Sequence, residues 1–252
     1  MRPIDKGPCP QVNGTDKTVR DYKDWRRDLI ARTGYYCAYC NMSLSHQLHV
    51  EHVTPKKPQS GHPAGNWLAW ENMLLACEKC NLAKSNKPSD ASIHYLPEYH
   101  NALLVFEALP DRLHTSAMIV APKSGLNVSQ QTKAQQTIDD FEWQNIDTRG
   151  AVVDIRWMKR SDTQIQVNAA RNLLEITKVS PTYNADFAGK CVATMATGTG
   201  FFLLWFQEFA NEPAVLKWLI DPALFPGVAQ SCFDPVTFQP VPRNPGDISD
   251  PT

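Results

Sequence analysis

The chain has 252 residues, 42% hydrophobic and 20% charged, a composition that excludes a fibrous or disordered protein and allows a buried core. The net charge of −1 divides unevenly: residues 1–90 hold 13 Lys and Arg against 9 Asp and Glu (+4), and residues 91–252 carry −5, so only the first part is mildly basic, as suits a polyanionic ligand. No run of 18 apolar residues is present and residues 1–5 lack the apolar core of a signal peptide, so we expect a cytoplasmic protein without a membrane span.

The first 90 residues are expected to form one domain with an extended arm, rich in Pro and Gly, over residues 1–16. The elements predicted after the arm are a helix over 19–33, a strand over 48–53, a second strand over 67–76 and a short helix from about Asn81. Strand, loop, strand and helix together predict a ββα unit.

The rest of the chain is predicted to be mainly helical, over residues 91–234, and to end in a Pro-rich tail over 235–252. Strands are expected over 103–108, 116–121 and 152–157, and helices over 132–141, 164–177, 201–209 and 214–220. The predicted fold class is therefore α+β: a ββα-metal unit followed by a mainly α-helical C-terminal region.

Two cysteine pairs bracket the ββα unit: Cys37-x2-Cys40 and, after 36 intervening residues, Cys77-x2-Cys80. Two such turns can aim four thiolates at one point, which suits closed, structural Zn²⁺ coordination in a reducing compartment. The alternatives are four scattered buried cysteines, or a site in which His46 or His49 replaces one of them. Cys9, Cys191 and Cys232 lack such spacing and are interpreted as thiols without a ligand role.

The candidate catalytic residues lie between and just after these pairs. An imidazole is largely neutral near pH 7, so His52 is a candidate general base. Glu51 and Asn81 offer the hard oxygen ligands that Mg²⁺ or Mn²⁺ prefers, and Lys84, three residues after Asn81 on the predicted helix, could bind a phosphate. In a regular strand Glu51 and His52 would point to opposite faces, so a shared site requires the strand to end or bend there.

Residues 35–87 resemble the HNH endonuclease family, whose pattern runs Cys-x2-Cys, Asp/Glu-His-Ile/Val-x-Pro, Asn, and Cys-x2-Cys-His/Asn-x2-Lys. The resemblance implies that His52 is the general base and that Glu51 and Asn81 are ligands of the catalytic metal. It also implies that Asn72 orients the loop and the base. The chain departs from the commonest pattern by having Glu51 instead of Asp and Asn81 instead of the last His.

A broader resemblance is to the PtuB proteins, the HNH effectors of Septu and retron-associated anti-phage systems. It rests on residues 1–7, 36–40, 50–56 and 225–234. It implies a PtuA-like, ABC-type ATPase partner and a DNA or tRNA substrate, and it suggests that the C-terminal region docks the ATPase. Residues 90–150 contribute nothing to this resemblance.

Two other functions compete with a nuclease: a zinc-ribbon module that binds nucleic acid without cutting it, and a module that regulates an ATPase by contact. His52, Glu51 and Asn81 argue against pure binding, which calls for Lys, Arg and aromatic residues. The apolar faces of the C-terminal region form either its core or a docking surface. They are Ile165/Ala169/Leu173/Ile176, Phe201–Phe206 and Trp218/Leu219.

Overall fold

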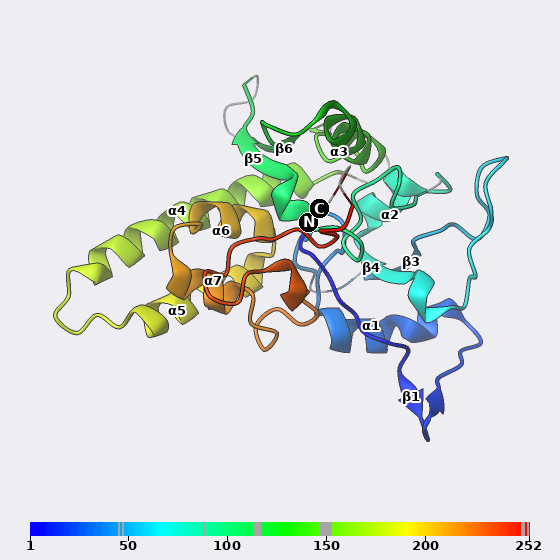
Figure 1. Ribbon diagram of the computed structural model, residues 1–252, viewed down its shortest axis with the longest axis horizontal. Helices are drawn as coiled ribbons and strands as arrows, with labels where there is room; N and C mark the ends of the chain where they lie inside the picture. Colours follow the sequence, from blue (N-terminus) through cyan, green and yellow to red (C-terminus); the bar gives the residue numbers. More distant parts are fainter. Residues whose placement is uncertain are drawn as a thin grey trace.

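The computed structural model describes residues 1–44, 46, 48–87, 89–112, 117–146, 153–247, 250 and 252. Within these residues the chain forms three two-stranded antiparallel sheets and seven α-helices, with most of the helices after residue 120 (Figure 1). The predicted α+β class and the helical C-terminal region are confirmed. No helix in the described ranges is long and apolar enough to cross a membrane.

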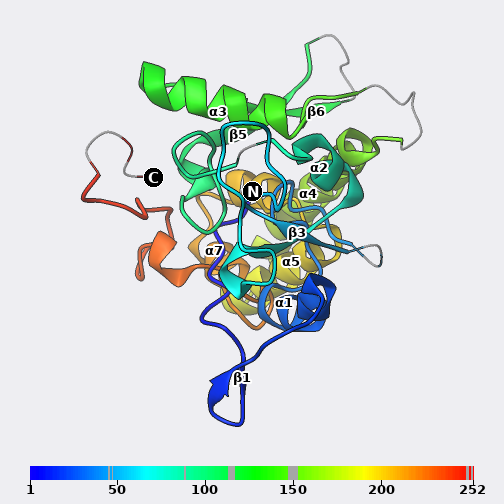
Figure 2. The same ribbon diagram turned by 90° about the vertical axis from the view of Figure 1, so that its right-hand side faces the viewer.

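The N-terminal arm contains a small hairpin that projects from the body in both views (Figures 1 and 2). Its strands are β1 (Gln11–Val12) and β2 (Thr15–Asp16); the helical segment that follows consists of a 3₁₀ turn, Tyr22–Trp25, and α1 (Arg26–Thr33). Asp21 caps the turn by accepting from the Lys23 N–H, and Gly34, at a φ of 73°, ends the helix. The predicted helix therefore begins three residues later than expected and ends where expected.

The ββα unit matches the predicted order. Strand β3 (His49–His52) pairs antiparallel with β4 (Met73–Ala76), placing Glu51 opposite Leu74, and α2 (Glu78–Lys84) follows. Helix α2 begins before Asn81, because the Cys77 sulfur accepts from the Cys80 N–H and caps the first turn. All four residues of β4 are buried, so this strand lies in the core.

In its described residues, the C-terminal region contains one hairpin, five helices and short 3₁₀ turns at Ala102–Leu104 and Gln230–Cys232. The main elements are β5 (Phe106–Pro110), β6 (Met118–Pro122), α3 (Val128–Asp140), α4 (Arg156–Lys178), α5 (Ala185–Thr199), α6 (Phe202–Glu208) and α7 (Pro213–Leu219). Of the predicted strand over 116–121, Ser116 lies outside the described residues. The predicted strand over 152–157 is wrong where it is described: residues 153–155 form no strand, and Arg156 and Trp157 open α4. The Asp154 carboxylate accepts a hydrogen bond from the Arg156 N–H at the start of this helix. Helix α5 was not predicted.

One hydrophobic core joins residues of the first 90 positions to residues of the helical region. Ile4 forms a β-bridge with Val228, and Met42 forms one with Gly200. Gly200 has a φ of 69°, and a Cβ there would lie 2.2 Å from the Asn41 carbonyl oxygen, so this contact requires glycine.

Helix α4 carries apolar residues on two sides, of which one faces the core. The side toward the core carries Thr163, Val167, Ala170 and Leu174. The predicted face, Ile165/Ala169/Leu173/Ile176, does share one side of the helix, but Ile165 and Ile176 are each 69% exposed. In contrast, Phe201–Phe206 is buried throughout. Figure 1 shows the α4–α5 pair extending from the body, away from the β3–β4 hairpin.

Candidate active site

The four cysteines of the two pairs are buried and form one cluster, in which all sulfur atoms lie within 4.8 Å of one another. The Cys40 and Cys77 sulfurs are 3.8 Å apart. A tetrahedron with Zn–S bonds of about 2.3 Å has edges of about 3.8 Å, so spacing and donor chemistry both fit zinc. Among the described residues, His46 and His49 are not members of this cluster, so the thiolate set needs no histidine.

His52 ends β3 and is partly exposed. Its Nε2 lies 3.0 Å from the carbonyl oxygen of Trp67. Because a carbonyl oxygen can only accept, Nε2 carries the hydrogen, and Nδ1 of the neutral ring is left as a proton acceptor. Burial lowers the pKa of His52 below its ordinary value, although the Trp67 carbonyl acts in the opposite direction. The imidazole is therefore neutral near pH 7.

Asn72 holds the chain that follows His52. Its Oδ1 accepts from the Thr54 N–H at 2.7 Å, and its Nδ2 donates to the carbonyl oxygens of Thr54 and Asn66 at 2.9 and 3.1 Å. Gly65 completes this contact, because a Cβ there would lie 2.3 Å from the Thr54 carbonyl oxygen and 2.6 Å from Asn72 Nδ2. The amide thus fixes both ends of the loop between the two strands.

Glu51 and Lys84 lie beneath the surface on which His52 is exposed. Lys84 Nζ is 2.7 Å from Glu51 Oε1 and donates to the His52 carbonyl oxygen at 2.8 Å, and the Tyr39 hydroxyl donates to Glu51 Oε2 at 2.7 Å. Both charged side chains are at most 3% exposed. Burial raises the pKa of Glu51, and the Lys84 and Tyr39 contacts oppose that rise. Strand β3 ends at His52, and the two neighbouring side chains differ in burial: Glu51 is 3% exposed and ion-paired, whereas His52 is partly exposed.

Asn81 lies one helical turn before Lys84 on α2 and is partly exposed, whereas Lys84 is buried. The structure therefore separates the predicted site residues into two layers. His52, Asn72 and Asn81 have solvent access, and the Glu51–Lys84 pair forms the layer below.

Three residues at this site were not predicted from sequence: Tyr22, Tyr39 and Trp67. The Tyr22 ring packs on the His52 ring with centroids 4.5 Å apart, and the ammonium groups of Lys56 and Lys23 lie 5.3 and 5.8 Å from the Tyr22 ring. In the sequence, Tyr22 is only an apolar position of the helix predicted over 19–33. Trp67 contributes its backbone carbonyl oxygen, and the residue type at a position does not predict such a backbone contact.

The comparisons with known proteins agree with this geometry over the metal-binding unit. Neither a search of curated proteins nor a search of solved structures found a match to the chain. A family model does match, over a stretch that contains both cysteine pairs and all the candidate catalytic residues. Residues 37–87 match the model of the HNH endonuclease family, and this part of the chain is an HNH endonuclease domain.

Proposed function

We propose that the protein is a divalent-metal-dependent endonuclease that hydrolyses phosphodiester bonds of nucleic acid, with His52 as the general base. The observation that carries the proposal is the bond between His52 Nε2 and the Trp67 carbonyl oxygen, which leaves Nδ1 free of its hydrogen. The lowered pKa of His52 keeps this nitrogen unprotonated at neutral pH.

In the proposed mechanism, Nδ1 of His52 accepts a proton from the attacking water. The Trp67 carbonyl oxygen holds the imidazole in the required tautomer, and the Tyr22 ring packs against it at an interplanar angle of 51°. Asn72 keeps the backbone after His52 in place through Thr54. These contacts orient the base before a substrate arrives, which lowers the entropy that must be lost in the reaction.

A bound Mg²⁺ or Mn²⁺ would supply positive charge for the phosphate and the leaving oxygen. Glu51 and Asn81 have the hard oxygen donors for such an ion. Asn81 is partly exposed, whereas Glu51 is 3% exposed and each of its oxygens already accepts one hydrogen bond, from Lys84 or Tyr39. A ligand role for Glu51 would use the second lone pair of an oxygen and stays a prediction. The contact of Lys84 with a phosphate stays a prediction; its buried position supports a second role, the fixing of Glu51.

The side chains near His52 favour the sugar-phosphate backbone of DNA or tRNA as substrate. Lys23 and Lys56 are exposed and lie beside Tyr22, so two cations and an aromatic ring border the base. The test is incubation of the purified protein with a panel of DNA and RNA in Mg²⁺ or Mn²⁺. Metal-dependent cleavage is expected, whereas binding without cleavage would favour the zinc-ribbon binding module instead.

We further propose that the nuclease is the effector of an anti-phage complex with an ABC-type ATPase, as the resemblance to PtuB implies. The exposed apolar side chains of α4 and α5 support a docking surface there. Leu173 is 55% exposed and Phe187 is 69% exposed, and both line a groove between the two helices. Exposed apolar patches of this kind mark interaction sites in soluble proteins.

Leu173→Glu and Phe187→Glu in the full chain test the docking surface. Each should abolish co-elution with the ABC-type ATPase encoded nearest to the gene, because a carboxylate would have to be buried at the interface. Val128→Glu on α3 is the matched control, since Val128 is 82% exposed and lies away from this groove. Co-elution of both α4–α5 variants at the wild-type level would refute this surface.

A further inference from the structure

Two arginines of α4 approach the cysteine cluster from the C-terminal region. Arg156 and Arg160 are one helical turn apart and are only 2% and 3% exposed. Arg156 Nη1 donates to the Cys80 sulfur at 3.2 Å, across 76 positions of sequence. The remaining donors of Arg156 contact Asp154 and the carbonyl oxygens of Phe141 and Glu142, so its guanidinium is fixed in direction.

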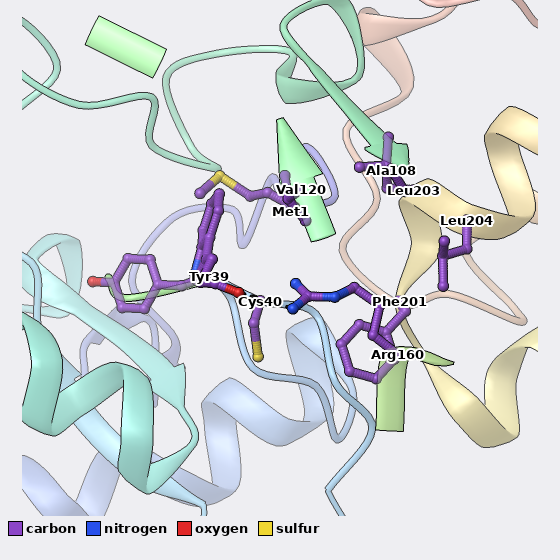
Figure 3. Close-up of a pocket in the computed structure, with 10 residues that line it drawn as sticks. Met1, Tyr39, Cys40, Ala108, Val120, Arg160, Phe201, Leu203 and Leu204 are labelled. Atoms are coloured by element: carbon purple, nitrogen blue, oxygen red, sulfur yellow. Dashed lines mark hydrogen bonds between the residues drawn. The ribbon is translucent and has the colours of Figure 1, made fainter. Parts of the chain in front are cut away.

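Arg160 lies near Cys40. It shares with Tyr39 and Cys40 the lining of a cavity of about 20 Å³, and Figure 3 shows its guanidinium on the Cys40 side of that cavity. Its Nε donates to the Met118 carbonyl oxygen and its Nη2 to the Trp143 carbonyl oxygen. Within the described chain these anchors are neutral, so they hold the arginine without neutralising its charge.

The charge of the metal site explains why two buried cations are placed there. Four thiolates around one Zn²⁺ carry a net charge of −2, and a buried charge without compensation is strongly unfavourable. The Asp154 carboxylate adds a further negative charge beside Arg156. Arg156 and Arg160 together reduce the total from −3 to −1. Arg156 also donates a hydrogen bond to the Cys80 sulfur, a contact from outside the ligand set of the kind that tunes metal ligands.

We propose that Arg156 and Arg160 are positioning residues of the zinc site: they stabilise the thiolates of Cys80 and Cys40, so zinc retention in residues 37–87 depends on helix α4. The nuclease unit and the helical region are thereby coupled through the metal, in addition to their shared core. This inference concerns the bound zinc, and it stands whether or not the chain cuts nucleic acid.

The test is the rate at which the zinc-loaded full chain releases its metal to a chromogenic chelator. Arg156→Met and Arg160→Met remove the charge and keep much of the bulk, and each should release zinc about 10–100-fold faster. Arg160→Lys should recover most of the retention, because it restores the charge. Arg171→Met is the control: Arg171 lies on the same helix and pairs with Glu208 and Glu212, so its loss weakens the fold away from the cysteines. Its release rate should stay at the wild-type value.

A second measurement separates an effect on sulfur from a general loss of stability. In the Co²⁺-loaded full chain, the sulfur-to-cobalt charge-transfer band reports how strongly the thiolates donate to the metal. Arg156→Lys keeps a cation and should fold, but it loses the fixed guanidinium and should move this band to lower energy. Arg171→Met should leave the band in place. The proposal is overturned if both methionine variants retain zinc as the wild type does, if Arg171→Met releases zinc as fast as they do, or if the cobalt band of Arg156→Lys is unchanged.

Discussion

The Lys84 ammonium lies 2.7 Å from Glu51 Oε1 and 2.8 Å from the His52 carbonyl oxygen, so a single group connects helix α2 to the strand that carries the candidate base. Both partners of the ion pair are buried. Removal of one partner from such a pair leaves the other as an uncompensated charge in a medium of low polarity. The pair therefore couples the stability of the HNH unit to the position of His52.

Lys84→Met should lower the free energy of unfolding by about 3–5 kcal/mol, because Glu51 would remain buried without its partner. Urea denaturation followed by circular dichroism measures this. Lys217→Met is the control: Lys217 and its partner Asp186 are about half exposed, so the loss of this surface pair should leave the free energy of unfolding close to the wild-type value. Equal denaturation midpoints for Lys84→Met and the wild type would show that the buried pair has no such role.

Asn72→Ala should slow cleavage at least about tenfold, because three hydrogen bonds that hold the chain after His52 are lost, each worth about 1 kcal/mol. Rates on one nucleic-acid substrate, measured at saturating metal, check this. Asn66→Ala removes only a side-chain cap on the Leu68 N–H and keeps the carbonyl that Asn72 contacts, so it serves as the control. A wild-type rate for Asn72→Ala would show that Asn72 does not position the base.

Cys77→Ser should prevent recovery of folded protein rather than only reduce activity. Zinc binding by four thiolates contributes about 10–16 kcal/mol in small zinc domains, as much as the whole stability of a typical protein. Elemental analysis of the wild type should find one zinc per chain, and Cys191→Ser should keep it, since Cys191 is exposed and outside the cluster. Wild-type protein that is folded but free of zinc or a comparable ion would contradict the assignment.

Stability should fall as the pH drops from about 6.5 to about 4, in part because of His100. Burial lowers the pKa of His100 to about 4, and the neighbouring Lys133 ammonium acts in the same direction. Between the unfolded pKa of about 6.5 and the folded value, the unfolded chain binds a proton that the folded chain does not, so stability is fully present above pH 6.5 and is lost below it.

His100→Asn keeps an acceptor for the Leu96 N–H and removes the titrating group. The free energy of unfolding, measured at pH 7.5, 5.5 and 4.5, should therefore fall less with decreasing pH than that of the wild type. The difference should be no more than about 3 kcal/mol over this range. The exposed His62, replaced by Asn, is the control. The same pH dependence in His100→Asn and the wild type would show that another group is responsible.

The four-cysteine cluster and the ββα unit could be predicted from sequence because their signals are local. Two Cys-x2-Cys pairs are typical of a metal site, and a glycine after a helical pattern, such as Gly34, is typical of a helix end. The partners of Glu51 could not be predicted in the same way. Tyr39 and Lys84 reach it from separate elements, and no spacing in the sequence encodes a contact that depends on how those elements pack.

The helical region shows where periodicity alone was insufficient. The apolar spacing of Ile165, Leu173 and Ile176 correctly predicted a helix, but it did not indicate which side faces the core. Helices α5 and α6 pack against α4, and its buried residues are Arg156, Arg160, Thr163, Val167, Ala170 and Leu174. Helix α5 is rich in Ala, Gly and Thr, which weakens its apolar pattern. The predicted strand over 152–157 contains Asp154, whose carboxylate instead accepts from the Arg156 N–H at the start of α4.

The most direct test of the proposed function is the cleavage rate of His52→Ala in Mg²⁺ or Mn²⁺, on the nucleic acid that the wild type cuts best. Loss of a general base should reduce the rate by about 10²–10⁴-fold. Zinc content and the urea midpoint should stay close to the wild-type values, because His52 is partly exposed and is not a member of the cysteine cluster. A His52→Ala protein that cleaves at the wild-type rate would contradict the assignment of His52 as the base.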